Sequence, residues 1–111
     1  MPEKSFGELA LYVWDYFYCS NVPQPGDEKV WKRIENATCR IRQTEVHFGP
    51  RNPPDVRRRH ARRSRNAIRL ALRQIVLLSQ PPERWVIEDL HRLDALVAGV
   101  IESLGEPIVL D

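Results

Sequence analysis

The sequence predicts an all-α protein, and more specifically an antiparallel up-and-down four-helix bundle that forms a single domain over residues 1–111. Three observations lead to this prediction. Apolar residues recur at helical spacing in four segments, breaks rich in proline and glycine separate these segments, and no alternating apolar pattern marks a strand. A chain of 111 residues has room for one hydrophobic core of this kind. The helices are expected at about residues 5–19, 27–48, 54–79 and 83–104.

The first expected helix, residues 5–19, begins with a capping box. Ser5 and Glu8 have the S-x-x-E spacing in which each side chain accepts a hydrogen bond from a backbone N–H group at the helix start. The segment SNVPQPG ends this helix, because its two prolines and its glycine favour a loop. The apolar stripe of the helix consists of Phe6, Ala10, Val13 and Phe17.

The second expected helix, residues 27–48, has a candidate N-cap and a clear end. Asp27 is a residue type whose carboxylate accepts hydrogen bonds from the free N–H groups at a helix start. The segment GPRNPP ends the helix, because it combines a terminating glycine with three prolines. The apolar stripe consists of Val30, Ile34, Ala37, Ile41 and Phe48.

The third expected helix, residues 54–79, begins with two residues that suit a first turn. Pro54 has the φ angle of a helix, and the negative charge of Asp55 is favourable at the positive end of the helix dipole. The segment QPPE follows and separates this helix from the next. The residues expected to face inward are Ala67, Ile68, Ala71, Leu72, Ile75 and Leu78.

The fourth expected helix, residues 83–104, has the most regular apolar pattern of the chain. Its apolar residues lie alternately four and three positions apart, which is the spacing of core positions in a helix bundle. Gly105 lies where a C-terminal cap belongs. The apolar stripe consists of Val86, Leu90, Leu93, Val97, Val100 and Leu104.

Net charge does not identify a partner. The 17 basic and 15 acidic residues give a formal charge of +2, so an acidic partner must be inferred from where the charges lie. The N-terminal residues lack the pattern of a signal peptide, and no apolar run reaches the roughly 18 residues of a membrane helix. We therefore expect a cytoplasmic protein in which Cys19 and Cys39 are free thiols.

A run of arginines distinguishes the third expected helix. Nine of the 17 basic residues lie between positions 51 and 73, and all nine are arginine. Five of them share one face on a helical projection, and this face is expected to lie opposite the apolar stripe. Like charges at this spacing cost about 0.2–0.5 kcal/mol per pair, so another interaction is expected to compensate. The five are Arg58, Arg62, Arg65, Arg69 and Arg73.

Two interpretations of these arginines remain open. They can face water or pair with carboxylates of neighbouring helices, such as those of Glu35, Glu45, Glu88 or Asp94. Alternatively they form a phosphate-binding face, because the planar guanidinium group matches phosphate oxygens with two parallel hydrogen bonds. No base-reading motif accompanies them, so binding would depend mainly on the nucleic-acid backbone and on salt concentration.

We expect no catalytic residue, no metal site and no cofactor. His47, His60 and His91 lack metal-ligand spacing, and His60 is expected at the rim or in the core. Glu88 and His91 form one Glu-x-x-His motif, whereas di-iron bundles need a second copy. Cys39 lacks a nucleophile signature. The sequence thus favours a protein that is not an enzyme.

The order of features resembles a group of small bacterial four-helix-bundle proteins. This group includes proteins encoded in intervening sequences of large-subunit ribosomal RNA genes and the accessory variability determinant of diversity-generating retroelements. Residues 33–41, RIENATCRI, look like its second-helix pattern I-x-x-A-x-x-x-I. Gly49 at the helix end, the basic segment RRSRNAIRLALRQIVLL and an aliphatic fourth helix follow in the same order. The resemblance spans about residues 6–104.

The resemblance implies an accessory protein that is not an enzyme and that binds RNA for a partner such as a reverse transcriptase. Relatives of the retroelement type assemble as a ring of five protomers with a basic surface. The resemblance therefore implies a homo-oligomer, and a pentamer if it extends to that type. The nucleic-acid contacts that it implies are Arg58, Arg62, Arg65, Arg69 and Arg73, with Arg33 and Arg40 as secondary contacts.

A protein-interaction module, such as an immunity protein or a scaffold that binds an acidic protein surface, is the alternative function. Arginine and aromatic residues are enriched at interface hot spots, so the segment YVWDYFY is its candidate anchor. Exposure of Trp14 and Tyr18 in one patch would favour this alternative. Internal pairing of the arginines with carboxylates of the fourth helix would favour it as well.

Overall fold

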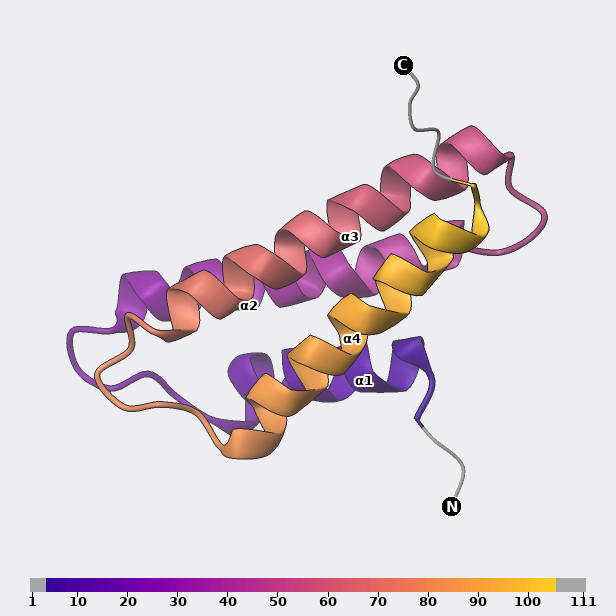
Figure 1. The fold of residues 1–111 in the computed structure, drawn as a ribbon. Coiled ribbons are helices and arrows are strands. Elements are labelled where there is room, and N and C mark those ends of the chain that lie inside the picture. The colour runs from indigo at the N-terminus through magenta and orange to yellow at the C-terminus, as the bar shows by residue number, and fades with distance from the viewer. Residues whose placement is uncertain (1–3, 106–111) are drawn as a thin grey trace.

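Four α-helices joined by non-helical connections make up the part of the chain that the computed structural model describes, residues 4–105 (Figure 1). Its elements are α1 (Phe6–Asp15), the π-helical turn η1 (Tyr16–Ser20), α2 (Glu28–Thr44), the 3-10 turn η2 (Glu45–His47), α3 (Pro54–Ile75) and α4 (Arg84–Ser103). No strand occurs within residues 4–105, and the predicted all-α fold class with four helices is confirmed.

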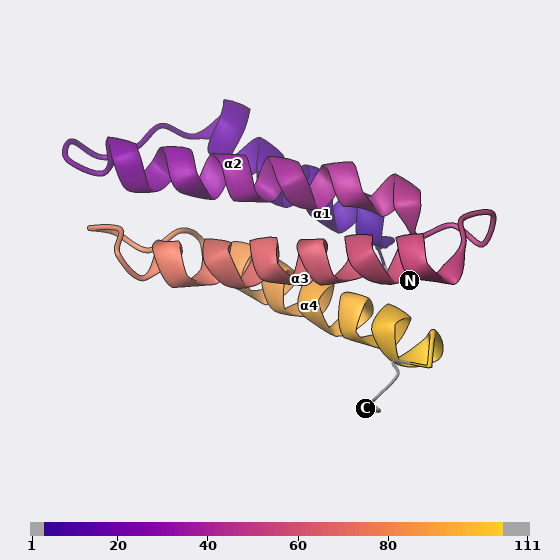
Figure 2. The same ribbon diagram turned by 90° about the horizontal axis from the view of Figure 1, so that it is seen from above.

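The helices enclose one hydrophobic core. α2 packs against α3, α3 packs against α4, and α1 packs against both α2 and α4. Seen from above, α1 and α2 lie on one side and α3 and α4 on the other (Figure 2). Arg33 contacts Gln74 near one end of the α2–α3 pair, and Phe48 contacts Arg57 near the other end. α2 and α3 therefore lie side by side along their length.

The predicted apolar stripes form this core. Leu9 and Ala61 are also buried, although the predicted stripes did not include them. The predicted residues that are buried are Ala10, Val13, Phe17, Ile34, Ala37, Ile41, Ala67, Ile68, Ala71, Ile75, Leu78, Val86, Leu90, Leu93 and Val97. The predicted residues that are only half-buried are Phe6, Val30, Phe48, Leu72, Val100 and Leu104.

Three of the predicted helix ends are confirmed. The capping box is complete, because Ser5 Oγ accepts from the Glu8 N–H at 3.2 Å and Glu8 Oε1 accepts from the Ser5 N–H at 3.1 Å. Pro54 lies in the first turn of α3. Gly105 ends α4 with a φ angle of +62°, in the left-handed region that favours glycine, and its N–H donates to the carbonyl of Glu102.

α3 ends at Ile75, earlier than the predicted end near residue 79. The Leu77 N–H donates to the carbonyl of Gln74 and the Leu78 N–H donates to that of Ile75, so the α-helical pattern tightens into three-residue turns. The apolar run continues through this turn, but Val76 is 78% exposed. The predicted first and second helices likewise change their hydrogen bonding and continue as η1 and η2.

Asp27 lies at the N-cap position of α2, as predicted, but its side chain makes no capping hydrogen bond, so that part of the prediction is wrong. Its Oδ2 atom instead accepts two hydrogen bonds from Ser79, from the backbone N–H at 3.0 Å and from Oγ at 2.8 Å. Asp27 is 8% exposed, and its carboxylate links the start of α2 to the turn after α3. Hydrogen bonds to a buried charged group stabilise a fold more than those of neutral surface groups.

We expect Asp27→Ala to lower the free energy of unfolding by about 1.5–3 kcal/mol. The substitution removes the charged acceptor of two hydrogen bonds, and the N–H and hydroxyl groups of Ser79 lose their partner. Denaturant titration followed by circular dichroism measures this change. Glu102→Ala, which removes an exposed carboxylate from α4, is the control and should stay within about 0.5 kcal/mol of the wild type. Equal stability of the two variants would contradict the role of Asp27.

Candidate nucleic-acid interface

The five predicted contact arginines of α3 do not share one exposed face. Arg62, Arg69 and Arg73 are exposed, whereas Arg58 and Arg65 are half-buried beside α4. The prediction that all five lie opposite the apolar stripe is therefore wrong for these two. The reason is that α4 packs along this flank of α3, and a helical projection of α3 alone does not contain that neighbour.

Arg58 and Arg65 interact with α4 or with their own helix. Arg58 donates from one terminal nitrogen to Asp55 Oδ1 at 2.9 Å and from the other to the Leu104 carbonyl at 3.4 Å, at the C-terminal end of α4. Arg65 Nε lies 3.5 Å from Asp94 Oδ1 without hydrogen-bond geometry, so the two attract each other as charges. Both side chains thus contribute to the packing of α3 on α4.

Arg57 also has a structural role, which sequence reasoning did not find. Its Nε atom donates to the carbonyl of Phe48 at 3.0 Å. This hydrogen bond connects the start of α3 to the end of η2 and holds the connection between α2 and α3. The partner is a backbone atom nine positions away, and no side-chain pattern in the sequence indicates it.

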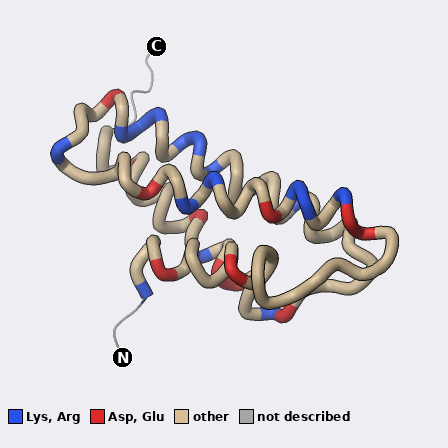
Figure 3. The backbone as a smooth tube through the Cα atoms, turned by 180° about the vertical axis from the view of Figure 1, so that it is seen from behind, with Lys and Arg blue, Asp and Glu red and all other residues tan. Residues whose placement is uncertain are grey.

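The remaining arginines of α3 and two arginines of α2 are exposed and form a basic surface. Figure 3 shows basic positions along the backbones of both helices. We call this the α2–α3 basic surface, and it consists of Arg33, Arg40, Arg59, Arg62, Arg63, Arg69 and Arg73. Within residues 4–105 the guanidinium groups of Arg40, Arg59, Arg63, Arg69 and Arg73 form no hydrogen bond or ion pair. Only one carboxylate, that of Asp55, belongs to α3.

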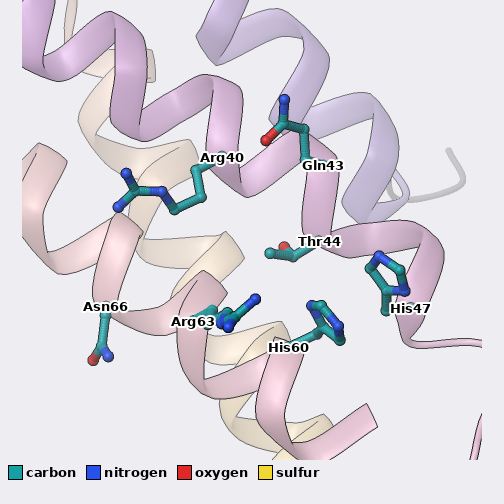
Figure 4. A pocket seen from close by; sticks show the side chains of 7 residues that line it. All are labelled: Arg40, Gln43, Thr44, His47, His60, Arg63 and Asn66. Carbon is teal, nitrogen blue, oxygen red and sulfur yellow. The ribbon is translucent and has the colours of Figure 1, made fainter. Parts of the chain in front are cut away.

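A groove of about 500 Å³ lies between α2 and α3 within this surface (Figure 4). His47 and His60 face each other at one end, with ring centroids 3.8 Å apart and ring planes within 16° of parallel. Arg63 extends toward His60, and Arg40 extends from α2 toward α3. The lining residues are Arg40, Gln43, Thr44, His47, His60, Arg63 and Asn66.

Sequence reasoning placed His60 at the rim or in the core, and it is half-buried, but the pairing with His47 was missed. Desolvation by burial lowers the pKa of His60, and the nearby His47, Arg63 and Arg59 lower it further. The only signal in the sequence was position, because both histidines lie close to the GPRNPP turn on either side. Residues so placed can meet when two helices pack side by side.

The aromatic segment predicted as an alternative interface is divided between core and surface. Phe17 is buried, while Trp14 and Tyr18 stack with ring centroids 4.5 Å apart and Tyr18 is 56% exposed. The guanidinium group of Arg42 lies 4.3 Å from the centre of the Trp14 ring. Trp14, Tyr18 and Arg42 therefore form a second surface feature, which we call the Trp14 patch.

Among the described residues, no group of three or more His, Cys, Asp or Glu side chains is arranged to hold a metal ion. Within the same part of the chain, every helix is too short or too polar to cross a membrane. The absence of catalysis and of cofactors, and the cytoplasmic location, remain predictions.

We expect Arg65→Glu to lower the free energy of unfolding by about 1 kcal/mol, because it places a second carboxylate beside Asp94. The charge-reversed double variant Arg65→Glu/Asp94→Arg should recover most of this loss. Arg69→Glu, on the exposed face of the same helix, is the control and should change stability by less than about 0.5 kcal/mol. If Arg65→Glu and Arg69→Glu have the same free energy of unfolding, the Arg65–Asp94 pair does not stabilise the protein.

The lowered pKa of His60 also predicts how stability depends on pH. The unfolded chain binds a proton at this residue more readily than the folded protein, so stability is full above about pH 6.5 and falls as the pH decreases below it. Denaturant titrations at pH 7.5 and 5.5 should show a smaller acid-induced loss for His60→Gln than for the wild type. His91→Gln, which changes an exposed histidine of α4, should lose as much as the wild type. If all three proteins lose the same stability between pH 7.5 and 5.5, His60 does not cause the acid-induced loss.

Comparison of this chain with protein-family models, with curated proteins and with solved structures found no match. The resemblance to small bacterial four-helix-bundle proteins therefore stays a prediction.

Proposed function

We propose that this protein is a nucleic-acid-binding accessory protein without enzymatic activity, and that it binds RNA through the α2–α3 basic surface. The proposed scaffold is an antiparallel up-and-down four-helix bundle. The observation that carries the proposal is the group of exposed guanidinium groups without partners in residues 4–105, at Arg40, Arg59, Arg63, Arg69 and Arg73. Phosphate groups supply the charge that this surface lacks.

The composition of the surface favours contacts to the backbone over contacts to bases. Arginine binds phosphate oxygens through paired hydrogen bonds, and such contacts position a nucleic acid without selecting its sequence. RNA helices are recognised largely by shape and by their phosphates and hydroxyl groups, which suits two adjacent helices that present positive charge. Arg58 and Arg65 are removed from the contact set, because they interact at the α4 side.

The proposal extends to the partners that the resemblance implies. The bound RNA would be held for an enzyme such as a reverse transcriptase, and the chain would act as a homo-oligomer, a pentamer if it follows the retroelement type. An oligomer would place several copies of the basic surface in one particle, which increases the number of phosphates contacted at once.

The Trp14 patch supports a second candidate function, that of a protein-interaction module for an acidic protein surface. Stacked aromatic side chains with an adjacent arginine are typical of interface hot spots. The ion pair of Arg65 with Asp94 of α4 also favours this alternative, because it neutralises part of the arginine ladder internally. The RNA proposal takes precedence because four arginines of α3, at positions 59, 63, 69 and 73, are exposed and have no partner within residues 4–105.

The test is a titration of the protein with structured RNA at 50 and 200 mM salt, concentrations of the order at which backbone-dominated complexes differ strongly in affinity. Arg63→Glu/Arg69→Glu should weaken binding at least about tenfold. The slope of log affinity against log salt concentration should become shallower by about two, which corresponds to two lost phosphate contacts. Lys4→Glu/Arg84→Glu is the matched control, because it changes the net charge equally at exposed positions outside the surface. It should change the affinity less than about threefold.

Helicity of both variants is checked by circular dichroism. Absence of binding at low salt, or an affinity that does not respond to salt, would refute the proposal. Equal weakening by the two double variants would refute the α2–α3 basic surface as the contact site.

A further inference from the structure

We propose that the groove between α2 and α3 binds one phosphate group of the RNA, and that Arg40, Arg63 and the stacked pair His47–His60 form the pocket. This inference rests on the proposed RNA-binding function and names the chemistry of one contact within it. The pocket is open to solvent at the surface and offers about 500 Å³, a volume within the range of small-ligand sites.

The side chains of the groove supply hydrogen-bond donors and positive charge. No carboxylate lines it. Thr44 Oγ1 already donates to the carbonyl of Ile41 at 2.8 Å, so this hydroxyl has no proton left to donate to a ligand. The free donors are therefore the guanidinium groups of Arg40 and Arg63, the imidazole N–H groups and the side-chain amides of Asn66 and Gln43, one N–H of Gln43 being directed to Cys39. Such a set matches a tetrahedral oxyanion, which accepts hydrogen bonds at every oxygen.

The charged groups around His60 favour the binding of an anion in the groove. From α2 and η2 it is faced by Arg40 and His47, and from its own helix by Arg59 and Arg63, so every charged or titratable neighbour in the groove is basic. The carboxylate of Glu45, also in η2, does not line the groove and lies beside Gly7 at the start of α1.

Protonation of His60 in the empty groove adds positive charge beside other positive charge. A bound phosphate reverses this balance, because an opposite charge nearby favours the charged form of the imidazole. Binding should therefore be accompanied by proton uptake, and it should become tighter as the pH falls.

The geometry fits binding and not cleavage of the RNA chain. In-line displacement at phosphorus places the attacking and leaving oxygens on opposite sides of the phosphate. The rings of His47 and His60 lie face to face at 3.8 Å, so no phosphate fits between them in this arrangement. Both imidazoles instead present their edges to the same groove.

The first experiment follows the ring-proton signals of the histidines by NMR as sulfate is added between pH 5.5 and 7.5. Sulfate is the probe because it stays doubly charged over this range, whereas a phosphate monoester titrates near pH 6. Sulfate should raise the pKa of His60 and bind about tenfold or more tightly at pH 5.5 than at 7.5. Exposed His91 on α4 is the internal control and should not respond.

Arg63→Ala should abolish the sulfate effect on His60, while Arg69→Ala, on the same helix outside the groove, should leave it intact. His60→Gln should reduce the pH dependence of sulfate binding to less than about threefold. A His60 signal that ignores sulfate, or responds equally in Arg63→Ala and the wild type, overturns the pocket.

The second experiment titrates the wild type and Arg63→Ala with a short RNA that carries either a 5′-phosphate or a 5′-hydroxyl group. A larger rise in the pKa of His60 with the 5′-phosphate supports a terminal phosphate as the occupant, and an equal rise supports an internal phosphodiester. RNA binding without any His60 response overturns the pocket and leaves the proposed function standing. Sulfate binding in the groove without RNA binding overturns the proposed function instead and assigns the groove to a free oxyanion.

Discussion

The packing of α3 between α2 and α4 determines where the arginines of that helix lie. α3 contacts both neighbours, and most of its buried residues are small, namely Ala61, Ser64, Ala67 and Ala71. Small side chains at an interface allow helices to approach closely. Because a neighbour lies along each flank, only a strip of α3 faces water, and arginines at the edges of this strip meet whatever the adjacent helix presents. The neighbours thus decide the environment of each charge.

The two flanks of α3 present opposite chemistry. On the α4 side, Arg58 meets a backbone carbonyl and Arg65 meets the carboxylate of Asp94, so positive charge is offset within the chain. On the α2 side, Arg63 lines a groove together with Arg40 and two histidines, and no carboxylate lines this groove. Positive charge therefore accumulates along one flank only. A partner with negative charge is complementary to that flank, and this asymmetry is the physical basis of both proposals.

Local signals in the sequence predicted the fold class, the core and several helix ends, but not the arrangement of the site. The capping box at Ser5 depends on residues within one turn, so the sequence alone reveals it. Asp27 looks like a cap for the same reason, yet its partner Ser79 lies 52 positions away. The pairing of the groove histidines and the partial burial of Arg65 likewise depend on which helix covers which flank. A helical projection describes one helix at a time and contains no such neighbour.

The two groove histidines belong to elements of unequal stability. His60 belongs to α3, a helix of 22 residues with a buried face, whereas His47 ends η2, a turn of three residues without a buried side chain. Segments with few buried contacts open locally at low cost in free energy. One wall of the groove can therefore loosen and re-form while the core stays folded. His47 can therefore shift while His60 stays in place, so the groove can adjust to ligands of different size.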